Sequence, residues 1–116
     1  MLRFAIAAAL LLLALPATAQ QSAFRASGPT VTLAASTTTA RVQILPADVT
    51  TQHARIYNSG TVAAFVACGD VTVVATTAAG MPIAPGTVEV IGCTSHIAGI
   101  TATGTATLYL TPGSGI

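Results

Sequence analysis

Apolar and polar residues alternate along much of the chain after Pro29, and no segment repeats apolar residues with the spacing of an amphipathic helix. Alternating stretches and runs of β-branched residues are separated by glycine, proline, asparagine and aspartate, which favour turns. This pattern predicts β-strands. The predicted strands are residues 30–33, 40–45, 54–57, 62–68, 71–76, 87–93, 96–101 and 105–111.

The alternation also predicts which side chains of the last strand face a core. Ala106, Leu108 and Leu110 fall on one side of that strand, whereas Thr107 and Tyr109 fall on the other. The side with alanine and leucine is therefore expected to face inward, and the side with threonine and tyrosine outward.

Two further features set the expected architecture. Residues 87–93 are apolar on both sides, which favours a central position in a sheet. About eight short strands at intervals of roughly 8–12 residues are typical of a β-sandwich, jelly roll or small barrel. We expect an all-β, single-domain β-sandwich or jelly roll over residues 30–116, preceded by a flexible leader at residues 20–29.

The beginning of the chain has the three parts of a secretory signal peptide. Arg3 supplies a positive charge, an apolar run covers residues 5–15, and Ala17-Thr18-Ala19 offers the small residues of a cleavage site. An uncleaved membrane anchor is the alternative, but the run is shorter than the roughly 20 residues that span a bilayer. We predict removal of residues 1–19, a secreted or periplasmic protein, and no membrane association after cleavage.

The expected mature chain carries almost no charge, which narrows the choice of partners. Its charged residues are three arginines, three acids and no lysine, and they are Arg25, Arg41, Arg55, Asp48, Asp70 and Glu89. Nucleic-acid binding and adhesion to anionic membranes both need clustered basic residues, so we expect neither. Threonine supplies much of the polar surface, and a sheet with few charges has little to oppose lateral packing.

Cys68 and Cys93 are the two cysteines of the chain, and both lie at the ends of predicted strands. In an exported protein such a pair predicts a disulfide. Two buried free thiols are one alternative. A zinc or copper site formed by Cys68, Cys93, His53 and His96 is another, although the paired Cys-x-x-Cys spacing is missing. We predict the disulfide, no metal and no cofactor.

The chain has no recognisable catalytic motif. Ser95, either histidine, and Asp48 or Asp70 could be named as a triad, but the sequence does not bring them together, and it has neither a nucleophile elbow nor a phosphate loop. We therefore expect a protein that is not an enzyme. Tyr57 and Tyr109, with Thr107 on the same side as Tyr109, are the candidates for an exposed contact with a partner.

A family resemblance rests on several strand and turn segments, which are residues 54–60, 61–66, 81–90 and 105–113. Through these segments the chain resembles small β-sandwich structural proteins of phages and prophages of α-proteobacteria. The resemblance implies a structural or decorating subunit and carries no catalytic residues. An export signal and two cysteines are not part of that family's pattern, so a related domain adapted to surface or secreted use would fit both observations.

Together these features predict a secreted, non-enzymatic structural or interaction domain that assembles with itself or decorates a larger surface. Its expected partner is a second copy or another protein. The alternative is a periplasmic or extracellular module that binds a sugar or a metal. A stable oligomer would favour the first function, and a dilute monomer with a pocket would favour the second.

Overall fold

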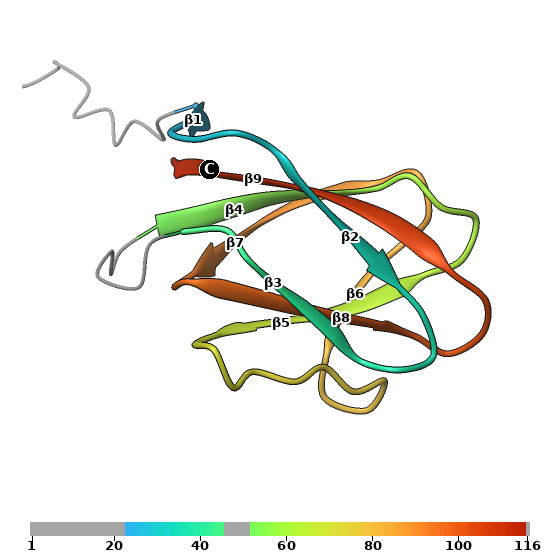
Figure 1. Cartoon of the computed structure of the whole chain (residues 1–116). Coiled ribbons are helices and arrows are strands. Elements are labelled where there is room, and N and C mark those ends of the chain that lie inside the picture. Colours follow the sequence, from blue (N-terminus) through green and yellow to red (C-terminus); the bar gives the residue numbers. More distant parts are fainter. Residues whose placement is uncertain (1–22, 46–51, 116) are drawn as a thin grey trace, which may run out of the picture.

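The computed structural model describes residues 23–45 and 52–115, and it is all-β (Figure 1). The predicted signal peptide and the cleavage site before Gln20 lie outside the described residues. The described residues form nine strands, which are β1 (Arg25–Ala26), β2 (Val31–Ala35), β3 (Ala40–Gln43), β4 (Gln52–Asn58), β5 (Ala64–Gly69), β6 (Met81–Ile83), β7 (Val88–Cys93), β8 (His96–Thr101) and β9 (Ala106–Ser114).

The strands form two antiparallel sheets that pack face to face (Figure 1). In the first sheet, β9 lies between β4 and the strands β1 and β2, and β7 follows β4 at the other edge. The second sheet has the order β3, β8, β5, β6. The prediction of an all-β sandwich is therefore confirmed.

The pairings are nested, and this nesting decides which kind of sandwich the chain forms. β5 pairs with β6, β4 with β7, β3 with β8, and β2 with β9. The first half of the chain thus pairs with the second half in reverse order, and successive pairs alternate between the two sheets. This connectivity is that of a jelly roll, in which a long hairpin is wrapped into two sheets.

The core lies between the sheets and follows the predicted alternation. On β9, Ala106, Leu108 and Leu110 are buried, whereas Thr107 and Tyr109 are exposed, so the predicted faces of this strand are confirmed. The remaining large, fully buried apolar side chains come from both sheets and are Ile56, Val66, Ile83 and Ile97. Burying each such side chain contributes about 1.5–3 kcal/mol.

The prediction of a strand at residues 71–76 was wrong, because this segment belongs to the loop between β5 and β6. The Asp70 carboxylate accepts hydrogen bonds from the Thr72 main-chain N–H at 2.8 Å and from the Thr72 hydroxyl at 2.5 Å. Such local side-chain bonds compete with a strand ladder for the same main-chain groups. Val71 and Val74 consequently remain 60% and 57% exposed.

Other differences concern strands at the edges of the sheets. β6 was not predicted, because Pro82 reads as a strand breaker, yet an edge strand tolerates proline. β1 falls within the predicted leader and pairs with the end of β9. The central position predicted for residues 87–93 was wrong, because these residues contain β7, which ends the first sheet.

Candidate interaction face

The outer surface of the first sheet carries a row of large side chains that crosses four strands. Val88 on β7 lies opposite Tyr57 on β4, Tyr57 lies opposite Tyr109 on β9, and Tyr109 lies opposite Thr32 on β2. The two tyrosine rings are stacked, with centroids 6.1 Å apart and planes inclined by 26°. Tyr57, Val88 and Tyr109 are 36%, 39% and 41% exposed.

A second row runs beside the first and is more polar. Val90 on β7 lies opposite Arg55 on β4, which lies opposite Thr111 on β9. The Thr111 hydroxyl shares a hydrogen bond of 2.7 Å with the Thr30 hydroxyl. Arg55 supplies the only charge in these two rows, so most of the face consists of aromatic, valine and threonine side chains.

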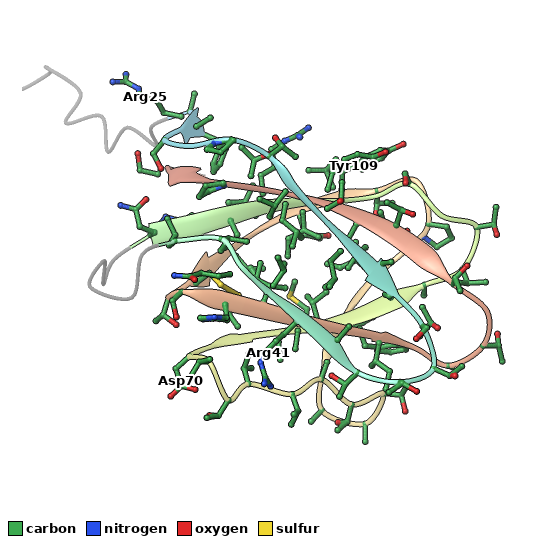
Figure 2. The ribbon with its side chains drawn as sticks, viewed as in Figure 1. Arg25, Arg41, Asp70 and Tyr109 are labelled. Carbon is green, nitrogen blue, oxygen red and sulfur yellow. A yellow bond between two sulfur atoms is a disulfide. The ribbon has the colours of Figure 1, made fainter. Side chains whose placement is uncertain are left out.

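The three predicted contact residues share this face. Thr107 is exposed on β9, two positions from Tyr109, and lies opposite Ala34 on β2. In Figure 2, Tyr109 projects from one side of the sandwich, and Arg41 and Asp70 lie on the opposite side. We call this surface the outer face, and it is formed by Thr32, Ala34, Arg55, Tyr57, Val88, Val90, Thr107, Tyr109 and Thr111.

A buried asparagine holds the end of β4, and with it the position of Tyr57. The Asn58 amide group donates to the Val62 carbonyl and to the Ile83 carbonyl, both at 2.9 Å, and its Oδ1 accepts from the Gly60 N–H at 2.9 Å. Gly60 has no space for a side chain, because a Cβ there would lie 2.8 Å from the Cβ of Ala106. The Asn58-Ser59-Gly60 turn is thus fixed by contacts that join both sheets.

A disulfide joins Cys68 on β5 to Cys93 on β7, which confirms the predicted pairing. Because β5 and β7 belong to different sheets, the bond links the two layers at one end of the sandwich. The Cα atoms of the two cysteines are 5.2 Å apart, within the ordinary range for disulfides. Cysteines joined in this way are not thiolate ligands for a metal.

A pocket of about 330 Å³ opens beside the disulfide, between Gln52, His53, Gly92 and Thr94. Two buried polar atoms here, Gln52 Oε1 and His53 Nδ1, have no hydrogen-bond partner among the described residues. Within residues 23–45 and 52–115, no group of three or more histidine, cysteine, aspartate or glutamate residues could hold a metal ion. Gln52, His53 and Thr94 are the polar side chains in the lining of this pocket.

Three candidate catalytic residues do come together near the same end of the sandwich. Ser95 Oγ and His96 Nδ1 are 2.8 Å apart. Hydrogen bonds from Thr72, with a smaller contribution from the charge of His96, hold the pKa of Asp70 below its usual value. Ser95 is buried, and its hydroxyl also donates to the Gly69 carbonyl at 3.4 Å, which ties the turn between β7 and β8 to the end of β5. Asp48 lies outside the described residues.

The sequence contained only part of the signal for this face. Thr107 and Tyr109 were identified from their alternation with apolar residues and Tyr57 as one of few aromatic residues, but Val88 and Val90 were expected inside a sheet. Comparison with family models, with characterised proteins and with solved structures found no match to this chain. The resemblance to phage structural proteins stays a prediction from the sequence.

Proposed function

We propose that the mature protein is a secreted or periplasmic, non-enzymatic structural domain whose outer face docks on a second copy or on another protein. The observation that carries the proposal is the continuous row of Val88, Tyr57 and Tyr109 across three strands. Tyrosine is enriched at protein interfaces because it buries a large apolar ring at a low entropy cost.

The low charge of the outer face supports the same function. Docking removes water from the groups in the interface, and the largest free-energy cost of this desolvation comes from burying an unpaired charge. Arg55 is the only charged group in the two rows, and the threonine hydroxyls can exchange water for hydrogen bonds to a partner. A decorating or self-assembling subunit, as the resemblance to phage structural proteins implies, would use a face of this kind.

The disulfide supports an oxidising compartment such as the periplasm or the extracellular space. We predict that the mature protein from the native host begins at Gln20, because Ala17-Thr18-Ala19 supplies the small residues that signal peptidase requires. N-terminal sequencing of the abundant form is the measurement. Recovery of Met1 on that form would contradict export by this route.

The test of the docking role is the substitution Thr107→Lys. A lysine there adds a flexible charge beside Tyr109, so we expect the dissociation constant of the assembly to rise at least tenfold, which is about 1.4 kcal/mol. The fold should persist, because Thr107 is exposed. Sedimentation velocity over a concentration series, together with retrieval of partners from the native host, measures the effect.

The matched control is Val71→Lys, which adds the same charge to an exposed loop off the face. Equal weakening by Thr107→Lys and Val71→Lys would remove the outer face from the interface. A wild-type domain that stays monomeric at high concentration and retrieves no partner would defeat the docking function.

The pocket beside the disulfide favours a second candidate function, that of a ligand-binding module. Gln52, His53 and Thr94 line this pocket, and such polar side chains would bind the hydroxyl groups of a small sugar. Calorimetric titration with monosaccharides and disaccharides tests this function, and Gln52→Ala should abolish any heat of binding. If the wild-type domain is monomeric and binds no sugar, neither proposed function is supported.

A further inference from the structure

The pocket beside the disulfide leads to the bond from the surface of the sandwich. Cys68 and Cys93 both line this pocket, together with His53 and Gly92. Cys68 is half-buried, whereas Cys93 is only 5% exposed. Disulfide exchange requires that a thiolate reach one of the two sulfur atoms, so access decides whether a disulfide reacts in a folded protein. Cys68 is therefore the more accessible end of this bond.

The pocket has room for a small thiol. Its volume of about 330 Å³ is in the range of pockets that hold small molecules. Gly92 forms part of the wall, and a Cβ built on Gly92 would meet no atom within 4 Å. The positive φ angles of the described residues fall on Gly86, Gly104 and Gly115, so the backbone of Gly92 does not require glycine. A larger side chain at this position would extend into open space at the pocket.

We propose that the disulfide is a reversible modification site, at which a low-molecular-weight thiol adds to Cys68 while the domain stays folded. The thiolate attacks Sγ of Cys68, a new S–S bond forms, and the bond between Cys68 and Cys93 breaks. Cys93 leaves as a thiolate and takes up a proton from water. The product carries a mixed disulfide on Cys68 and a thiol on Cys93, and the step consumes one external thiol and no other oxidant or reductant.

The fold accommodates this product. Sγ of Cys93 lies 3.6 Å from the His96 carbonyl oxygen, so an S–H group on Cys93 has an acceptor close by. β5 stays paired with β6 and β8, and β7 stays paired with β4, so opening the bond does not detach either strand from its sheet. The Cys93 thiolate can attack Sγ of Cys68 again and expel the external thiol, which makes the modification reversible.

This site is independent of the proposed docking function, because the residues that line the pocket are not those that form the outer face. It uses the pocket of the ligand-binding alternative, but exchange changes the covalent mass of the protein and sugar binding does not. The two uses of the pocket are therefore separated by intact mass.

The first test asks whether exchange needs unfolding. The mature wild-type protein is treated with 2-mercaptoethanol in urea concentrations below the unfolding transition, and loss of the disulfide is followed by alkylation and intact mass. We expect a rate proportional to the thiol concentration that changes less than about twofold per molar urea. Exchange through global unfolding would instead accelerate at least about fivefold per molar urea, because unfolding exposes buried surface. That steep dependence would overturn the proposal.

The second test locates the adduct. Rapid alkylation with N-ethylmaleimide traps free thiols, and fragmentation mass spectrometry then identifies the group on each cysteine. We expect 2-mercaptoethanol on Cys68 and the maleimide on Cys93. The reverse assignment, or no mixed disulfide at any thiol concentration, would contradict attack at Cys68.

Gly92→Phe tests the route through the pocket, with Thr103→Phe as the matched control. The ring at position 92 should obstruct the pocket and slow adduct formation at least about tenfold, because exchange depends on access. Thr103 is exposed in the turn between β8 and β9, at the other end of β8 from Cys93, so the same ring there should change the rate less than about twofold.

Melting temperatures establish that both phenylalanine variants are folded, and Gly92→Leu replaces Gly92→Phe if the ring prevents folding. An unchanged rate of adduct formation in a folded variant with a large side chain at position 92 would overturn the route through the pocket.

Discussion

Replacing Cys68 and Cys93 together by alanine is expected to lower the free energy of unfolding by about 3–4 kcal/mol. The disulfide links two residues 25 positions apart, so its loss raises the conformational entropy of the unfolded chain. The bond also joins the two sheets, so its loss removes a link at one end of the folded sandwich. For a domain of this size the loss corresponds to a fall in melting temperature of roughly 15–30 °C. Calorimetry or guanidinium unfolding of the mature domain measures it.

Reduction provides the matched control for this prediction. A thiol reductant should lower the melting temperature of the wild-type protein toward that of the double alanine variant and leave the variant unchanged. The intact mass of the wild-type protein should be about 2 Da below that of the dithiol form. A variant less than about 1 kcal/mol below the wild-type protein would contradict the structural role of the bond.

Asn58→Ala is expected to lower the free energy of unfolding of the otherwise wild-type protein by about 3–5 kcal/mol. The wild-type side chain is fully buried and bonds the Val62 and Ile83 carbonyls and the Gly60 N–H. Alanine would leave these three main-chain groups without their partner; the bond to Ile83 is buried and the other two are partly buried, and an unsatisfied buried group costs about 1–3 kcal/mol. Denaturant unfolding at neutral pH measures the loss.

Ser59→Ala serves as the neighbouring control. The Ser59 hydroxyl donates one exposed hydrogen bond to the Thr107 carbonyl at 2.9 Å, so its loss should cost less than about 1 kcal/mol. Equal costs for Asn58→Ala and Ser59→Ala would show that the buried network at the end of β4 contributes nothing specific.

Asn58→Asp adds a pH dependence with a defined sign. The new carboxyl would be buried beside two carbonyl oxygens, and this environment raises its pKa in the folded state above the unfolded value. The folded state then binds more protons than the unfolded state, so the stability of this variant rises as the pH falls toward the unfolded pKa. Unfolding free energies for the variant and the wild-type protein between pH 4 and pH 8 test the sign.

The proposed docking through the outer face would leave the second sheet free. Arg41 and Asp70 lie on the opposite side of the sandwich from Tyr109 (Figure 2). A subunit joined through the first sheet would therefore expose the second sheet and the loop between β5 and β6.

The sequence by itself determined the class of the fold, the inner and outer sides of β9 and the pairing of the cysteines. These features depend on local information. The alternation of Leu108 and Leu110 with Thr107 and Tyr109 follows from the two-residue period of any strand. The disulfide needed only two cysteines and an expected oxidising compartment.

The local sequence pattern did not predict the structure correctly where side-chain hydrogen bonds competed with strand formation, or where the position of a strand in its sheet mattered. The segment around Val71 and Val74 has the β-branched residues of a strand, but Thr72 bonds Asp70 instead. Val88 and Val90 look central because they are apolar, yet β7 is an edge. Apolar residues occur both in buried strands and on exposed sheet faces, so the sequence did not separate the two.

Only the tertiary structure decided which strands became neighbours. Tyr57 and Tyr109 are far apart in the chain, and their stacking exists because β4 and β9 pair in one particular register. Strand pairing is selected by the packing of all nested pairs at once, and a shift by one residue would turn every buried side chain outward. The outer face is therefore a property of the wrapped jelly roll, although each of its residues is visible in the sequence.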